Sequence, residues 1–289
     1  MQNIKLFIEL TRLDKPIGYM LLFWPCLWGL TVAYNFNQDL KLFLFYSFLF
    51  FTGSVLMRSA GCIVNDIVDR NFDKKVERTK NRPIASGKIS VFNASIYVII
   101  LCSLALLVLI NFNHLTIILA IASMPLAFTY PLMKRFTYWP QLFLGITFNY
   151  GLVLGWTSVQ ENLSLIPIIF YLGAIFWTLG YDTIYGYQDI KDDEIIGVKS
   201  TSIKYKKNPK KLLYLCYSIT ILSLIFVGIY MKFNLIYFLS IIIVFFHLFI
   251  LQINKLNINK PNICLNIFKS NNFIGLLIFL NILAGKLIS

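Results

Sequence analysis

Two groups of acidic residues are spaced so that each can line one face of a helix. Asn65, Asp69 and Asp73 follow one another at intervals of four residues, so a helix turns by only about 80° from the first to the last. Asp189 and Asp193 are also four residues apart. Carboxylate and amide oxygens arranged in this way predict two sets of ligands for a hard divalent cation, such as Mg²⁺.

We expect the second acidic group to begin earlier, on one continuous helix. Asp182, Asp189 and Asp193 are separated by seven and four residues, which places them within about 20° of one line. Tyr185 lies about 60° to one side of that line, and Asp66 lies about 100° from its neighbour Asn65. The candidate metal ligands are Asn65, Asp66, Asp69, Asp73, Asp189 and Asp193.

Basic residues accompany both acidic groups. Mg²⁺ in proteins usually takes one or two carboxylates, and its remaining positions go to water or to substrate phosphates. Arg and Lys side chains then bind the other phosphate oxygens. The candidates for this role in diphosphate binding are Arg70, Lys74, Arg78, Arg82, Lys191 and Lys199. A single charged run of this kind is usually a solvated loop beside a membrane segment, but two runs with the same spacing favour a magnesium–diphosphate site.

Arg58 places a charge inside an apolar segment. It precedes Asn65 by seven residues, which is about 10 Å along a helix and within about 20° of the same face. Charges inside membrane segments are costly and are usually functional or paired. Arg58 therefore faces a cavity and binds an anion, or else its side chain extends to the nearby aqueous boundary.

The elements that must position these residues are membrane helices. The 289 residues are 58% hydrophobic and 13% charged, and the mean hydropathy is +0.71. Apolar runs of about 20 residues recur, and each can cross about 30 Å of hydrocarbon as a helix. We expect an all-α, polytopic protein with about nine spans, at residues 16–35, 42–64, 91–110, 115–133, 141–158, 164–183, 212–230, 235–253 and 271–287.

The distribution of basic residues predicts the orientation. With the N-terminus in the cytoplasm, all but three of the 26 Lys and Arg residues face that side. This matches the positive-inside rule, so the net charge of +13 indicates orientation and gives no reason to expect nucleic-acid binding. We expect a single transmembrane domain over residues 1–289, in which the acidic motifs at 65–73 and 182–193 indicate an internal duplication.

The N-terminal segment bears on the membrane in which the protein resides. Residues 2–15 show no signal-peptide cleavage site, and they contain Glu9 and Asp14, which a mitochondrial presequence would avoid. We therefore expect a bacterial inner membrane, with the mitochondrial inner membrane as the alternative. The five cysteines have no paired spacing and are expected to be packing residues.

The charged stretches resemble motifs of the UbiA family of intramembrane prenyltransferases. "NDIVDRNFD" with "RTKNRPIASG" resembles the first aspartate motif of that family, and "YDTIYGYQDIKDDEIIGVKST" resembles the second. "RLDKPIGYMLLFWPCLWGL" and "YPLMKRFTYWPQLFLG" resemble the branch that acts on 4-hydroxybenzoate. The resemblance covers about residues 12–202. It implies nine helices around a central cavity capped on the cytoplasmic side, and Mg²⁺-dependent transfer of a polyprenyl group from a polyprenyl diphosphate to 4-hydroxybenzoate in ubiquinone biosynthesis.

That reaction requires two further roles. Arg135 is the first candidate for binding the carboxylate of the acceptor and Arg58 the second, whereas the alternative is that Lys134 and Arg135 are only a charged anchor at the membrane boundary. Asp182 or Tyr185 is the candidate base that takes the ring proton.

Other aromatic substrates that receive the prenyl group in this family, namely a naphthoate, homogentisate, haem or a chlorophyllide, stay open. An ion-coupled transporter is the alternative of another class, although its acidic residues would be expected near the bilayer midplane.

Overall fold

The computed structural model describes residues 2–37 and 39–287, and within them it contains helices and connecting turns but no strand. Eight of its helical segments are long and apolar enough to cross a membrane. A further apolar helix of 17 residues, α2 (Ile17–Ala33), is slightly shorter. The expected all-α, polytopic architecture with about nine spans is therefore confirmed.

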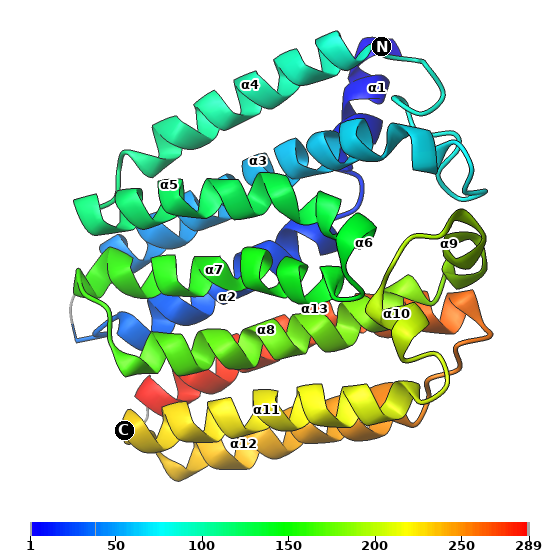
Figure 1. Ribbon diagram of the computed structural model, residues 1–289. Helices are drawn as coiled ribbons and strands as arrows, with labels where there is room; N and C mark the ends of the chain where they lie inside the picture. Colours follow the sequence, from blue (N-terminus) through cyan, green and yellow to red (C-terminus); the bar gives the residue numbers. More distant parts are fainter. Residues whose placement is uncertain (1, 38, 288–289) are drawn as a thin grey trace.

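The other spanning helices overlap the expected runs. They are α3 (Leu40–Asp73), α4 (Val91–Leu109), α5 (His114–Thr129), α7 (Pro140–Gln160), α8 (Leu165–Gly186), α11 (Pro209–Tyr230), α12 (Leu235–Phe245) with the π-helix η2 (Phe246–Ile253), and α13 (Pro261–Leu287). Of these, α3 and α13 are longer than expected. The short helices are α1 (Gln2–Thr11), η1 (Tyr130–Leu132), α6 (Met133–Phe136), α9 (Ile190–Ile196) and α10 (Thr201–Lys204). Figure 1 shows α1, α6, α9 and α10 at one end of the bundle. We call this the charged end, and it includes the loop of residues 74–90.

The length of α3 places the first acidic motif at the charged end. Its 34 residues correspond to about 51 Å of straight helix, whereas the hydrocarbon core is about 30 Å thick. The helix begins at Leu40, where the Asp39 side chain accepts a hydrogen bond from the amide of Lys41 at 2.9 Å. Its last turns, from Asn65 to Asp73, therefore extend to the boundary between hydrocarbon and water.

Glycines let α2 and α7 cross at backbone contact. A Cβ at Gly29 of α2 would lie 1.9 Å from the carbonyl oxygen of Leu152, and a Cβ at Gly155 of α7 would lie 2.2 Å from that of Cys26. Small residues at a helix crossing permit such an approach inside a membrane, where packing rather than the hydrophobic effect drives association. The crossing holds α2 against the centre of the bundle.

α13 begins at Pro261 rather than at the expected residue 271. The helix therefore takes in residues 261–270, which the expected span left out, and the two residues that follow them bond to tryptophans of other helices. Asn271 Oδ1 accepts a hydrogen bond from Trp177 Nε1 of α8 at 2.9 Å, and Asn272 Oδ1 accepts one from Trp24 Nε1 of α2 at 2.8 Å. α13 thereby joins α2 to α8.

A small apolar cluster fixes the elements of the charged end to α3. Leu10 of α1 and Ile84 and Ile89 of the loop at residues 74–90 are buried against Ala60 and Ile63 of α3. Burial of each such side chain contributes about 1.5–3 kcal/mol. The loop that follows the first acidic motif is therefore folded back onto the helix that carries the motif.

We expect Gly29→Val and Gly155→Val each to lower the stability of the folded protein by at least about 3 kcal/mol, because the clash is with backbone that cannot rotate away. The measurement is the thermal unfolding midpoint in detergent. Gly53→Val on α3 is the matched control, since a Cβ at Gly53 meets only Val108, at 3.9 Å. An unfolding midpoint like that of the wild type in both variants would contradict the α2–α7 contact.

Candidate functional site

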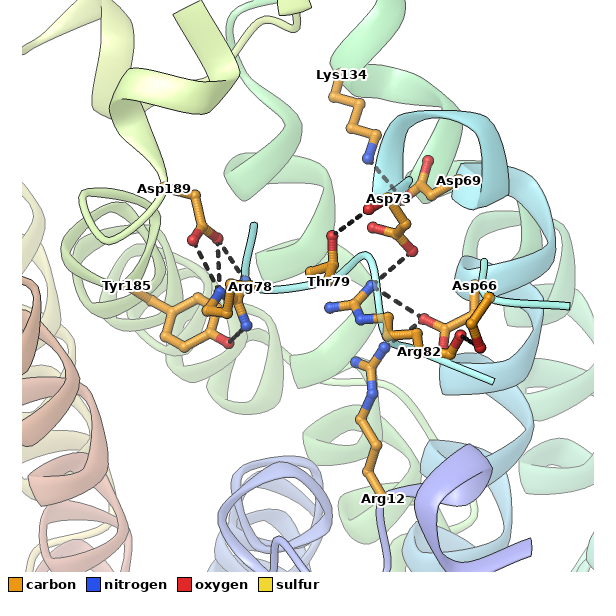
Figure 2. Close-up of polar contacts among 11 residues, drawn as sticks. Arg12, Asp66, Asp69, Asp73, Arg78, Thr79, Arg82, Lys134, Tyr185 and Asp189 are labelled. Atoms are coloured by element: carbon orange, nitrogen blue, oxygen red, sulfur yellow. Dashed lines mark hydrogen bonds and ion pairs between the residues drawn. The ribbon is translucent and has the colours of Figure 1, made fainter. Parts of the chain in front are cut away.

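The aspartates of α3 lie at the charged end and are paired with basic residues from other elements. Asp66, Asp69 and Asp73 are buried, with 1%, 2% and 6% of their surface exposed. Arg82 Nη1 lies 3.1 Å from Asp66 Oδ1 and 2.8 Å from Asp73 Oδ2 (Figure 2). Asp66, which the helical phase placed to one side of the motif, is thus joined to Asp73 through one guanidinium.

Arg12 belongs to this cluster, although it was not among the expected site residues. It follows α1 directly, its φ is 56°, and its guanidinium donates a hydrogen bond to Asp66 Oδ1. Such a φ is uncommon outside glycine and reverses the chain between α1 and α2. The available signal was an arginine within the N-terminal stretch that resembles the UbiA family, but its partner is a tertiary contact.

Lys134 and Arg135 of α6 point to different groups. Lys134 Nζ lies 2.6 Å from Asp69 Oδ2, whereas Arg135 is exposed and donates to the carbonyl of Val68 at 2.8 Å. The position of Arg135 therefore does not support the expectation that it binds the acceptor carboxylate, since its guanidinium donates to a backbone carbonyl of α3. Its neighbour Lys134, which the sequence left as a possible anchor, reaches the carboxylates instead.

The second acidic motif does not lie on one continuous helix. α8 ends at Gly186, and Asp189 stands at the N-terminal boundary of the separate helix α9. The expected alignment of Asp182 with Asp189 and Asp193 along one line is therefore wrong, because helical phase is lost at the break. Asp189 and Asp193 still share the first turn of α9, where the amide of Asp193 donates to the carbonyl of Asp189 at 2.9 Å.

Arg78 holds Asp189 from the loop of residues 74–90. Its Nε lies 2.8 Å and 3.0 Å from the two carboxylate oxygens, and its Nη2 donates to the same group. Its Nη1 lies 3.3 Å from the Tyr185 hydroxyl, and its guanidinium carbon lies 5.6 Å from the centre of the Tyr185 ring (Figure 2). Because Arg82 of the same loop holds Asp66 and Asp73, this loop connects the two acidic motifs.

Asp193 is half-buried near this pair. Burial raises the pKa of Asp193 to about 6, and repulsion from the Asp189 carboxylate adds to the rise. A cation placed between the two carboxylates would reverse both effects and favour the ionised form. The carboxylate of Asp193 would therefore be stabilised by a cation bound beside it.

Within residues 2–37 and 39–287, the other expected diphosphate-binding residues form no ion pair with the acidic motifs, whereas Arg78 and Arg82 do. Three of them are exposed, namely Arg70, Lys74 and Lys191. Lys199 Nζ lies 5.7 Å from the centre of the Tyr138 ring and donates to the carbonyl of Phe136 at 3.3 Å. In the conformation described here, Arg78 and Arg82 are the two of the six that the structure brings to the acidic motifs.

A second polar group lies deeper in the bundle, between α3, α7 and α8. The guanidinium carbon of Arg58 lies 5.3 Å from the centre of the Phe148 ring, and its buried Nε has no hydrogen-bond partner within the described residues. Gly18 of α2 leaves room for this side chain, because a Cβ there would lie 2.8 Å from Arg58 Nε. Asp182 of α8 interacts electrostatically with Arg58. The guanidinium is thus available to an anion at this depth.

The donor atoms at the charged end suit magnesium. Carboxylate oxygens, with the amide oxygen of Asn65, are the ligands that this ion prefers. Asp69 Oδ1 is buried and has no hydrogen-bond partner among the residues described, so one acceptor is already unused. Over residues 2–37 and 39–287, no three acidic, His or Cys side chains converge on one point. Basic side chains stand between the carboxylates, and their release would free the remaining oxygens.

Comparisons with known sequences and folds agree on one family. The profile of the UbiA prenyltransferase family matches residues 22–280. A mitochondrial 4-hydroxybenzoate polyprenyltransferase of Bos taurus is 45% identical over 283 residues, which cover 97% of this chain and 75% of that protein. The protein of the same name from Drosophila pseudoobscura pseudoobscura is 43% identical, with 98% and 71% covered, and that from Homo sapiens is 42% identical, with 97% and 75% covered.

Solved structures share the fold. The apo structure of a UbiA homologue from Aeropyrum pernix K1 superposes with a TM-score of 0.76 at 22% identity, covering 92% of this chain and 96% of that one. A UbiA homologue from Archaeoglobus fulgidus, solved with GPP and Mg²⁺ bound, gives 0.71 at 18% identity, with 97% and 99% covered. Given this architecture and the two acidic motifs joined by one basic loop, the chain belongs to the UbiA prenyltransferase family.

Proposed function

We propose that the chain is a 4-hydroxybenzoate polyprenyltransferase of ubiquinone biosynthesis. It transfers a polyprenyl group from an allylic polyprenyl diphosphate to the ring carbon beside the hydroxyl of 4-hydroxybenzoate. The observation that carries this proposal is the identity of 45%, over 97% of the chain, to a relative of that name. The site supports it with cation and phosphate ligands at the charged end and a guanidinium deeper in the bundle.

The charged end binds the diphosphate. The residues that would hold magnesium supply oxygen donors: Asn65, Asp69, Asp73, Asp189 and Asp193. Magnesium held there would neutralise the diphosphate and make it a better leaving group. Arg78, Arg82 and Lys134 are already beside the carboxylates, and after release they donate hydrogen bonds to phosphate oxygens. Asp66 stays paired with Arg12.

The acceptor binds below the diphosphate. Its carboxylate pairs with Arg58, whose buried Nε has no partner within the described chain, and this orients the ring carbon beside the hydroxyl toward the allylic group. The allylic C–O bond breaks and its electron pair leaves with the diphosphate. The π electrons of the ring form the new C–C bond, and Asp182 or Tyr185 takes the proton from that carbon.

Aromatic rings of α8 pack against one another and against Phe268 of α13. The rings of Trp177 and Tyr181 are 4.9 Å apart, and those of Tyr185 and Phe268 are 4.4 Å apart. Their faces stabilise positive charge that develops on the allylic carbon. Their apolar bulk also excludes water, which would otherwise react with that carbon.

The proposed partners are a polyprenyl diphosphate, 4-hydroxybenzoate and the bilayer. The protein is a multi-pass membrane protein, and its charged end faces the cytoplasm or its mitochondrial equivalent. The bacterial inner membrane was the first expectation, but the relatives cited above are named as mitochondrial proteins. These names favour the mitochondrial inner membrane, which was the alternative.

The first test removes metal ligands. We expect Asp69→Ala and Asp189→Ala to lower the prenylation rate by about 10²–10³-fold, because each removes part of the charge that stabilises the leaving group. The rate is measured in isolated membranes with 4-hydroxybenzoate and an allylic diphosphate, with and without EDTA, and the product is identified by mass. Glu194→Ala is the control, since Glu194 pairs with Lys206 on the surface. A wild-type, Mg²⁺-dependent rate in both aspartate variants would show that the metal assignment is wrong.

The second test separates Arg58 from Arg135. Loss of a hydrogen bond to a charged group costs about 1.5–3 kcal/mol, so we expect Arg58→Ala to raise the KM for 4-hydroxybenzoate by about 10- to 150-fold. Arg135→Ala should leave that KM unchanged, because Arg135 contacts the backbone of α3. The reverse pattern would restore Arg135 as the carboxylate partner. Size-exclusion chromatography confirms that both variants fold.

The third test uses pH. Because the pKa of Asp193 is raised to about 6, its carboxylate is ionised at neutral pH and becomes protonated as the pH falls through 6. Protons then compete with magnesium, so the Mg²⁺ concentration for half-maximal rate should rise by up to about tenfold for each pH unit below 6. Asp193→Asn should weaken Mg²⁺ binding at neutral pH and flatten this dependence. A Mg²⁺ requirement that is constant between pH 7.5 and 5 in the wild type would contradict the prediction.

A further inference from the structure

Gly61 has open space where a side chain would lie. It lies on α3, three residues after Arg58 and four before Asn65. A Cβ built at Gly61 would meet no atom within 4 Å. Its neighbours Ala60 and Cys62 are fully buried, so the open space is confined to the side of α3 that Gly61 faces.

Neither the backbone nor the packing accounts for a glycine at this position. Among the described residues, Gly87 and Gly197 are the glycines with positive φ, so Gly61 has an ordinary helical conformation. At Gly29 and Gly155 a Cβ would collide with the backbone of the facing helix, whereas at Gly61 it would collide with nothing. Glycine is less favourable than alanine in a helix interior. The glycine at position 61 therefore points to a need for the space that a side chain would fill.

The open space lies between Arg58 and Asn65, to which the proposed function assigns different substrates. Arg58, Gly61 and Asn65 fall within about 60° of one another around α3 and span about 10 Å along its axis. This face looks across the bundle, because the Arg58 guanidinium reaches Phe148 of α7. The polar groups above and below the space suit an aromatic acid better than an apolar prenyl chain.

We propose that Gly61 determines acceptor specificity: the space left by its missing Cβ holds the ring of the aromatic acceptor between Arg58 and the diphosphate bound at Asn65. This rests on the proposed function and names the substrate class of the same site. The acceptor is a hydroxybenzoate whose carboxylate faces Arg58, and the tolerated size of a substituent beside its hydroxyl depends on residue 61. Filling the space would exclude larger acceptors first.

The test is a graded series, Gly61→Ala, Gly61→Val and Gly61→Leu, with Gly53→Ala as the matched control on the same helix. Kinetic constants are measured for three acceptors of increasing size: 4-hydroxybenzoate, 3,4-dihydroxybenzoate and 4-hydroxy-3-methoxybenzoate. The KM for the allylic diphosphate and the thermal unfolding midpoint are measured on the same preparations. Alanine favours a helix and has room at Gly61, so the first variant should fold at least as well as the wild type.

We expect Gly61→Ala to raise the KM for 4-hydroxybenzoate by about tenfold and to affect the methoxy compound more strongly, since one methylene in a binding pocket changes discrimination by 10- to 200-fold. The effect should grow from Ala to Leu, and the KM for the diphosphate should not change. Gly53→Ala should match the wild type in every constant.

Three outcomes would overturn the proposal. They are unchanged acceptor constants in all Gly61 variants, a rise in the KM for the diphosphate instead, and an equal loss in Gly53→Ala. The wild-type rate with 4-hydroxybenzoate tests the proposed function by itself, whereas the ratios between variants and wild type test Gly61. If the wild type prefers another aromatic acceptor, the same ratios are measured with that compound.

Discussion

Charge neutralisation at the end of α3 is the constraint on which the rest of the structure depends. Asp66, Asp69 and Asp73 are buried where a helix leaves the hydrocarbon, and an uncompensated carboxylate there would cost several kcal/mol. Each of the three has a cationic partner from another segment, as does Asp189 on α9. In the proposed reaction, the carboxylates would hold magnesium in place of these basic partners, and the released basic side chains would bind the diphosphate. The site therefore remains balanced in charge before and after the substrate binds.

This exchange requires that the basic side chains stay close when they are released. The loop at residues 74–90 is held by Ile84 and Ile89 in the apolar cluster on α3, so Arg78 and Arg82 cannot move far from the acidic motifs. Lys134 is held on α6, where the carbonyl of Lys134 accepts a hydrogen bond from the amide of Lys199 at 2.9 Å. The packing of the charged end thus keeps the phosphate ligands positioned while their partners change.

The sequence predicted the spans well, because about 20 consecutive apolar residues leave a membrane helix few alternatives. It failed where a helix ends or begins among polar residues. The phase from Asp182 to Asp189 assumed one helix, although Gly186 is a residue type typical of helix ends. The start of α13 was placed too late, at residue 271, because residues 261–270 include polar side chains such as Asn266 and Lys269.

In the candidate site, too, local spacing was predictable from the sequence and tertiary contacts were not. Local spacing identified the aspartates, because i and i+4 relations within one helix are set by the sequence alone. The partners of those aspartates come from distant segments, such as Arg12, which is 54 residues from Asp66 in sequence. No local pattern predicts which of several basic residues folds back, so Lys134 was passed over in favour of Arg135. Such contacts follow from tertiary packing.

In the proposed function, the order of residues along α3 lets one helix bind two substrates of opposite character. Asp73 and Asp69 lie nearest the aqueous boundary, Asn65 follows, and Gly61 and Arg58 lie deeper. A diphosphate is costly to desolvate and is best bound near water, whereas an aromatic ring gains from burial. The carboxylate of the acceptor is the exception, because it must be carried to the depth of Arg58. That cost is offset because Arg58 is itself a buried cation, and the two charges are more stable together than either is alone. A buried cation at Arg58 would therefore allow a charged acceptor to bind near the allylic carbon, which must be kept away from water.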